Sequence, residues 1–168
     1  FADDDALIGN LAGEAGIDRL TGGAGSDTFK FWAGDSGSPN AGFDTISDFA
    51  KGSGDRIDFS AALTVGGTAA AATASRASVN SATGVATFAA GSGITLADAL
   101  SDVSASFTAG GNAAGEFSLF KVNAAGDAYL LISDGVAGIG ANDVLIRLSG
   151  ITSVGAISLS DGDLAILI

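Results

Sequence analysis

Hydrophobic and polar positions alternate along most of the C-terminal half of the chain, a pattern that favours β-strands. Three segments follow it, EFSLFKV (116–122), AYLLIS (128–133) and DVLIRLSG (143–150). Glycine, asparagine and aspartate separate them, as is usual for turns between strands. We therefore predict three strands over these ranges.

The first of these strands is apolar on both of its sides. Successive side chains of a strand point to opposite faces, so one face carries Phe117, Leu119 and Lys121, and the other carries Ser118, Phe120 and Val122. Strands that are apolar on both sides are buried on both sides. We expect the sheet that contains this strand to be covered on both faces.

A helical period is present in one place, TLADALSDVSASF at 95–107. Apolar residues recur there at i, i+3 and i+4, and Thr95 precedes the first of them in the position of an N-cap. The residues of the apolar face are Leu96, Ala99, Leu100, Val103 and Phe107. The pattern thus predicts a mostly β protein with one helix.

The N-terminal region repeats with a period of nine residues. GEAGIDRLT (13–21) and GGAGSDTFK (22–30) share two glycines, one aspartate and one apolar residue in the same register. Glycine adopts positive φ at little steric cost, so such turns can aim several carbonyl groups at one point. The aspartate adds a carboxylate at the same point. Such a set of oxygen ligands suits Ca²⁺ better than Mg²⁺, because Mg²⁺ requires a smaller and more regular octahedral coordination shell.

One such turn cannot fill the coordination sphere of Ca²⁺, which takes about six to eight oxygens. A neighbouring turn has to supply the rest, so repetition is part of the binding site. Without the cation the carboxylates repel one another, and glycine-rich backbone loses much entropy on ordering. Metal binding and folding are therefore expected to be coupled.

The amino-acid composition excludes two further classes of binding function. The chain has 168 residues, with 19 acidic and 7 basic ones and a formal charge of −12. This balance argues against binding to nucleic acid and to anionic membranes. Of the acidic residues 17 are aspartate, which prefers turns, and only Glu14 and Glu116 are glutamate.

Catalysis by this chain is not expected. It contains neither cysteine nor histidine, which removes thiol chemistry, most zinc sites and the usual general base. We identify no catalytic residue, and we expect any catalytic domain to lie upstream. No apolar run has the length of a membrane span, and no N-terminal signal peptide is visible.

The stretch GGAGSDTFK fits G-G-x-G-x-D-x-(apolar)-x at every fixed position, and GEAGIDRLT departs only at Glu14. In this it resembles the RTX family of calcium-binding repeats. The resemblance implies a parallel β-roll with two nonapeptides in each coil and calcium between stacked turns. Carried over by position, the ligands are the side chains of Asp18 and Asp27 and the backbone of Gly13, Gly16, Gly22 and Gly25.

The phrases DTISDF and GDRIDFS resemble the segment that follows the last repeats in secreted RTX proteins. The resemblance implies that Asp44, Asp48 and Asp55 help to close the last calcium sites, and we favour Asp44 and Asp55. Ordinary loop capping is the alternative for all three. Asp58 is expected to cap a turn or short helix.

The C-terminal stretch GDAYLLISDGVAGIGANDVLIRLSGITS resembles the last module of type I secreted bacterial proteins. Asp163 followed by Leu164–Ile168 fits an uncleaved export signal. A final β-strand is the alternative interpretation, and the two do not exclude each other.

Asp134, Asn142 and Asp143 could hold another cation, but a plain hairpin turn is favoured. We also expect Phe31 and Trp32 to cover the end of the roll.

We therefore predict an all-β fold, the end of a parallel two-sheet β-roll continued by a β-sandwich-like cap with one short helix. The expected divisions are terminal RTX turns at 1–31, a roll-closing segment at 32–60 and a C-terminal cap with the secretion signal at 61–168. The implied cofactor is Ca²⁺, the implied partner is the type I (ABC) secretion machinery, and the implied location is extracellular or at the cell surface.

A structural role is the main alternative. The chain could be the self-assembling end of an S-layer protein or large adhesin, with calcium also bridging copies of the chain. The lack of cysteine, histidine and methionine and the bias towards alanine, threonine, serine, glycine and valine suit such a protein.

Overall fold

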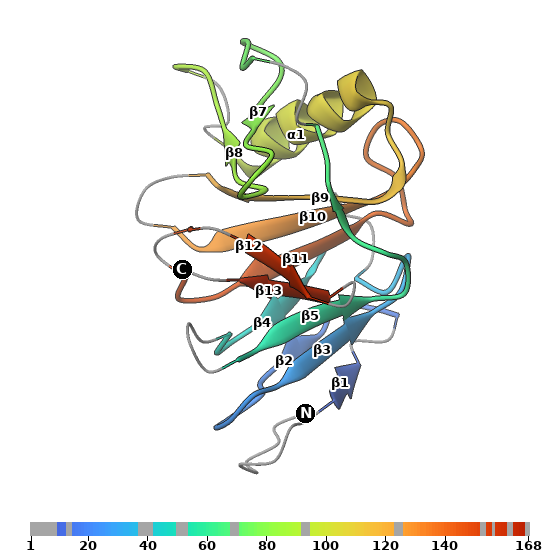
Figure 1. Cartoon of the computed structure of the whole chain (residues 1–168), viewed down its shortest axis with the longest axis vertical. Coiled ribbons are helices and arrows are strands. Elements are labelled where there is room, and N and C mark those ends of the chain that lie inside the picture. Colours follow the sequence, from blue (N-terminus) through green and yellow to red (C-terminus); the bar gives the residue numbers. More distant parts are fainter. Residues whose placement is uncertain are drawn as a thin grey trace.

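The architecture is described from a computed structural model of the chain. It describes residues 10–12, 15–36, 42–49, 54–67, 71–91, 95–122, 126–151, 154–155, 157–160 and 163–166. Over these residues the fold is all-β apart from one helix, as the sequence predicts. The strands β1 to β5 lie towards one end of the molecule and the helix lies at the opposite end (Figure 1).

The first five strands form a parallel roll. They are β1 (Asn10–Ala12), β2 (Arg19–Leu20), β3 (Thr28–Phe31), β4 (Asp44–Ile46) and β5 (Arg56–Phe59). The chain alternates between two sheets, so β1, β3 and β5 are neighbours in one sheet while β2 and β4 are neighbours in the other. All pairs within this group are parallel.

The coils of the roll lengthen towards the cap. Asn10 of β1 pairs with Thr28 of β3, 18 residues further on, which is two nonapeptides. Arg19 of β2 pairs with Thr45 of β4, 26 residues on, and Thr28 pairs with Arg56 of β5, 28 residues on. The last coil therefore keeps the strand positions of the repeat but joins them by longer loops.

The C-terminal part of the chain adds the remaining elements. They are β6 (Thr64–Val65), β7 (Ser78–Val79), β8 (Ala86–Thr87), α1 (Leu96–Gly110), β9 (Ala114–Lys121), β10 (Ala128–Asp134), β11 (Val144–Leu148), β12 (Ile157–Ser160) and β13 (Asp163–Ile166).

Both sheets run continuously from the roll into the cap. The sheet orders are β1-β3-β5-β13-β12 and β2-β4-β11-β10-β9-β6. β13 joins β5 in antiparallel register, and β11 joins β4 in parallel register. The cap strands thus cover the two backbone edges that the last coil would otherwise leave open, a protection that exposed sheet edges require.

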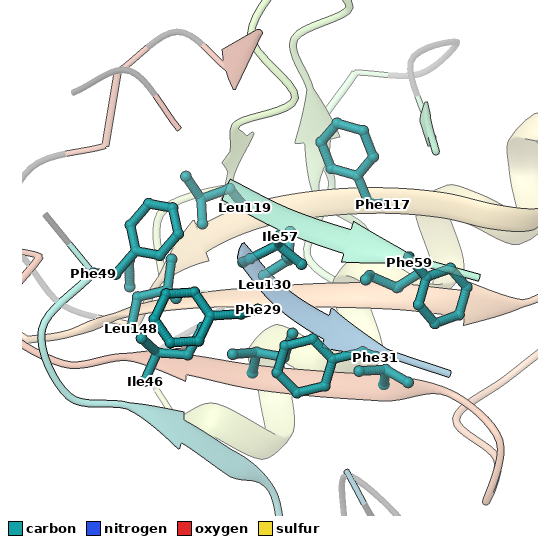
Figure 2. Packing of buried hydrophobic residues seen from close by; sticks show 14 of the residues in the cluster. Phe29, Phe31, Ile46, Phe49, Ile57, Phe59, Phe117, Leu119, Leu130 and Leu148 are labelled. Atoms are coloured by element: carbon teal, nitrogen blue, oxygen red, sulfur yellow. The ribbon is translucent and has the colours of Figure 1, made fainter. Parts of the chain in front are cut away.

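The main core lies between the two sheets. Phe29, Phe31, Ile57 and Phe59 point inward from one sheet, and Ile46, Phe117, Leu119, Leu130 and Leu148 meet them from the other (Figure 2). Phe29 is fully buried, and its ring centroid lies 6.0 Å from that of Phe49. Truncation of such a residue to alanine typically costs about 3–5 kcal/mol, so the repeat positions Leu20 and Phe29 anchor the roll to the cap.

A second core covers the outer face of β9, β10 and β11. Helix α1 and the hairpin β7–β8 pack there against Phe120, Leu131 and Leu145. The strand 116–122 is therefore buried on both faces as predicted, with Phe117 and Leu119 in the first core.

Helix α1 begins where the sequence predicts. The Thr95 Oγ1 accepts a hydrogen bond of 3.1 Å from Asp98 N, which satisfies one of the free N–H groups of the first turn. Ala99, Leu100, Val103 and Phe107 are buried. The helix extends three residues beyond the predicted range and ends at Gly111, whose φ of 113° is a left-handed C-cap.

Candidate metal centre

The aspartates of the repeats stand at the start of the roll strands. Asp18 and Asp27 directly precede β2 and β3, Asp44 opens β4, and Asp55 directly precedes β5. Because β2 pairs with β4 and β3 with β5, the register brings Asp18 beside Asp44 and Asp27 beside Asp55. The chain changes sheets at every turn, so the two pairs lie at opposite edges of the roll.

The Asp18–Asp44 pair is held by a direct contact. Asp18 N donates a hydrogen bond of 2.7 Å to Asp44 Oδ1, and Thr45 N donates one of 2.8 Å to Asp18 O. Asp44 is completely buried, and among the described residues its Oδ2 has no hydrogen-bond partner. A buried acceptor oxygen without a donor is a position that a cation or a proton would satisfy.

The electrostatics at this edge favour a cation. Burial raises the pKa of the Asp44 carboxyl from 3.8 to about 6, the N–H group of Asp18 opposes the rise, and the negative charges of Asp18 and Asp35 add to it. Asp35 lies in the loop GDSGSPNAG and was not among the predicted ligands. The only feature of the sequence that could have indicated a role for Asp35 is its position as an aspartate within a glycine-rich loop.

The Asp27–Asp55 pair repeats the arrangement at the other edge. Asp27 N donates to Asp55 Oδ1 at 3.1 Å, and Arg56 N donates to Asp27 O at 2.9 Å. Both aspartates are buried. Gly22 leaves the space that the Asp27 side chain occupies, since a Cβ on Gly22 would lie 2.7 Å from Asp27 Cγ.

The glycines of the two repeats serve different purposes. Gly16 and Gly25 have φ of 148° and 121°, so they supply the positive φ that the turn requires. Gly22 is outside that region and is required by space alone. Gly13 lies outside the described residues, so its contribution stays a prediction.

Asp48 differs from its neighbours because both of its oxygens already have donors. Gly22 N donates to Asp48 Oδ1 at 3.0 Å and Gly23 N donates to Asp48 Oδ2 at 2.8 Å. The carboxylate thereby caps the glycine turn of the preceding coil. The ranking of Asp44 and Asp55 above Asp48 as ligands stays a prediction.

The prediction for Asp58 is wrong. Asp58 lies within β5 and pairs directly with Lys30 of β3, with Nζ and Oδ2 3.3 Å apart. It caps no turn, because the strand that begins at Arg56 continues through it. A cross-strand ion pair of this kind depends on a register that local sequence does not reveal.

The loop between β10 and β11 has the contacts of a hairpin turn. Asp143 Oδ1 accepts from Asp134 N at 2.9 Å and Asp143 Oδ2 accepts from Gly140 N at 2.7 Å. Asp134 Oδ1 accepts from Val136 N at 2.7 Å. These bonds favour the turn over the cation site. Burial raises the pKa of the Asp143 carboxyl, the two N–H groups lower it, and the Asp134 carboxylate adds to the rise.

The donor set fits a cation bound by two carboxylates and backbone oxygens. Within the described part of the chain, no three acidic side chains converge on one point. Each edge offers instead one register-paired couple of aspartates beside glycine turns. Such a couple matches the hard oxygen donors that Ca²⁺ prefers.

The fold and the site define a class of protein. Its members contain the end of a parallel β-roll, with paired aspartates at the turns, followed by a β-rich cap. Residues 2–70 match the model of the family described as Peptidase M10 serralysin C terminal. The match confirms that this part of the chain is an RTX-type C-terminal segment, of the kind that binds calcium in secreted proteins. No curated protein matches the chain.

The matched residues include every predicted ligand position. The family describes the non-catalytic C-terminal part of serralysin-type proteins and not their peptidase domain. The absence of catalysis in this chain stays a prediction. None of the helices among the described residues has the length and apolarity needed to cross a membrane.

Proposed function

We propose that the chain is a calcium-gated folding module at the C-terminal end of a larger secreted protein. Calcium binds between the last coils, with Asp18 and Asp44 at one edge and Asp27 and Asp55 at the other. Backbone carbonyls of the turns at Gly13, Gly16, Gly22 and Gly25 complete the sites.

The observation that carries this proposal is the buried Asp44 carboxylate. One oxygen accepts a hydrogen bond from the neighbouring coil, the other has no donor among the described residues, and the negative charges of Asp18 and Asp35 act on this carboxylate. A cation turns this repulsion into attraction. In calcium-poor cytosol the chain stays loose, and at extracellular calcium even sites with Kd of about 10⁻⁴–10⁻³ M fill.

Calorimetric titration of calcium into the chain tests the ligand assignment. Asp44→Asn keeps the shape of the side chain but removes one charged ligand, so it should weaken calcium binding about tenfold or more. Asp98→Asn removes the same charge from the exposed start of α1 and should leave binding unchanged. Equal calcium affinity in Asp44→Asn and the unmodified chain would contradict the assignment.

We further propose that the C-terminal segment from Asp163 is the signal read by a type I exporter. In the folded chain Asp163–Ile166 form β13, whose Leu164 and Ala165 pair with Ile57 and Arg56 of β5. A strand held in a sheet is not accessible as an extended signal. Export and folding are therefore exclusive, which suits a chain that folds only after it meets calcium outside the cell.

Self-assembly at the cell surface is the second candidate. β12 is an edge strand of its sheet, and Leu159 on it is 44 % exposed. Open edges with apolar side chains promote pairing between chains. Calcium-dependent growth of particle mass in light scattering would favour this role, whereas a monomer at high protein and calcium concentration would contradict it.

A further inference from the structure

The outer face of β3 and β5 carries a small group of side chains that calcium binding does not use. Trp32, the only tryptophan of the chain, follows β3 and is 47 % exposed. Together with Lys30, Phe31, Asp58 and Ser60 it lines a surface pocket of about 140 Å³. A half-exposed indole beside a pocket offers a flat face on which a ligand can stack, together with an N–H donor.

The register of the two strands assembles this pocket. Lys30 pairs with Asp58 across β3 and β5, and Ser60 N donates a hydrogen bond of 3.1 Å to Phe31 O as the pairing ends. Side chains two residues apart point to the same face. Trp32 therefore joins Lys30, and Ser60 joins Asp58, on the face that points away from the core.

The backbone of Trp32 is fixed before any ligand arrives. Trp32 N donates to Asp35 Oδ2 at 2.8 Å, and Asp35 N donates to Trp32 O at 3.1 Å. The residue thus begins a closed turn instead of a free loop. A backbone that is ordered in advance reduces the entropy lost when a ligand binds to the residue.

Charge decides which class of ligand suits the pocket. Lys30 Nζ and Asp58 Oδ2 lie 3.3 Å apart and neutralise each other, so the pocket offers no net attraction to an anion or a cation. The ammonium has three donors and the carboxylate about four acceptor positions, so both keep capacity towards a ligand. An apolar ligand would leave these groups unsatisfied.

We propose that this pocket is a subsite for a neutral saccharide. A sugar ring has a C–H face that stacks on an indole and hydroxyl groups that both donate and accept hydrogen bonds. Lys30, Asp58 and Ser60 provide the matching acceptors and donors. The volume is below the ~300–1,000 Å³ of pockets that enclose drug-sized ligands, so the subsite takes one ring of a longer glycan.

Tryptophan fluorescence tests this proposal directly. Trp32 is the only tryptophan of the chain, so its emission reports on this site alone. Maltotriose, cellotriose and chitotriose are titrated separately into the calcium-saturated chain, with trigalacturonate as the anionic comparison. At least one neutral trisaccharide should shift or quench the emission with Kd on the order of 1 mM, a weak affinity expected of a shallow site. If none does so up to tenfold higher concentration, the proposal is wrong. Preference for trigalacturonate would also overturn it.

Variants locate the binding by saturation-transfer NMR on the sugar protons, which needs no tryptophan. Trp32→Ala should weaken binding roughly tenfold, and Trp32→Phe should keep part of it. Val136→Ala, at another exposed apolar residue, serves as the matched control and should bind normally. Circular dichroism confirms that each variant folds. Unchanged binding in folded Trp32→Ala would place the saccharide elsewhere and overturn the proposal.

Discussion

At the scale of single residues, the role of each aspartate depends on what its two oxygens accept. Asp48 receives two backbone N–H groups and Asp143 receives two as well, so both complete turns. Asp44 receives only one from the described residues and is buried. In the sequence these aspartates look alike, each in or beside a glycine-rich turn.

Replacement of Gly22 tests the packing of a proposed ligand. In Gly22→Ala the new Cβ would overlap the Asp27 carboxylate, which has to move away from its position beside Asp55. We expect a loss of about 1–3 kcal/mol in the free energy of unfolding and weaker calcium binding, measured by urea denaturation at saturating calcium and by calorimetric calcium titration.

Gly140→Ala provides the control for that variant. A Cβ on Gly140 would lie 3.8 Å from its nearest neighbours, an ordinary contact, and Gly140 is not among the glycines with positive φ. This variant should be as stable as the unmodified chain or slightly more so. A Gly22→Ala chain that matches Gly140→Ala in stability and calcium affinity would contradict the account of Gly22.

The raised pKa of Asp44 predicts the effect of pH on the calcium-free fold. The folded state holds this proton up to about pH 6, whereas the unfolded chain releases it near 3.8. The contribution of Asp44 to stability is therefore present below pH 3.8 and is lost as pH rises to 6, by roughly 3 kcal/mol.

Circular dichroism of the chain in EGTA between pH 4 and 7 measures this effect as the change in residual β signal. Asp44→Asn should remove most of the slope, because it carries no titrating proton. A slope in Asp44→Asn equal to that of the unmodified chain would assign the pH dependence to other carboxyls.

At the scale of elements, local patterns were sufficient for α1 and for β9, β10 and β11. The nine-residue period likewise indicated that the two repeats share one register, in which Leu20 and Phe29 are the apolar positions. Apolar spacing and turn residues of this kind act over a few positions. Long-range pairing was not predictable in this way. Nothing in the local sequence indicates that β11 lies beside β4 or that β13 lies beside β5.

The segment from Gly34 to Ser36 links the turn at Gly16 to the cap and was also not predicted. Gly16 N donates to Asp35 O at 2.9 Å, while Gly34 N donates to Asn142 O at 3.2 Å. The buried Ser36 Oγ donates to Leu145 O at 2.7 Å and accepts from Leu145 N at 2.9 Å. The Ser36 hydroxyl thus satisfies both backbone groups of Leu145, as a neighbouring strand would, although the two residues are 109 positions apart in the sequence.

Loss of this hydroxyl should loosen the cap. Ser36→Ala leaves both backbone groups of Leu145 without this partner, so we expect the free energy of unfolding to fall by about 1–3 kcal/mol. Hydrogen exchange at the Leu145 amide should accelerate. The matched control is Ser118→Ala, which removes a buried serine that donates one bond of 3.1 Å to Gly84 O. A smaller loss in Ser36→Ala than in Ser118→Ala would contradict this role.

At the scale of the whole molecule, the roll and the cap share both sheets and one core. They should therefore fold together, although the divisions at residues 31 and 60 stay a prediction. Ten of the 17 aspartates lie at or before Asp58, so the repulsion that opposes folding is concentrated in the roll. Neutralising the two turn edges with calcium would stabilise roll and cap at once.

The central claim is tested most directly by far-ultraviolet circular dichroism of the chain in EGTA, titrated with calcium and separately with magnesium. The account predicts that the β signal rises with calcium and is reversed by EGTA, while magnesium has little effect. Asp44→Asn should move the calcium midpoint upward about tenfold. A chain with the same β signal in EGTA as in calcium would contradict the account, since the cap and the core would then hold the fold without the cation.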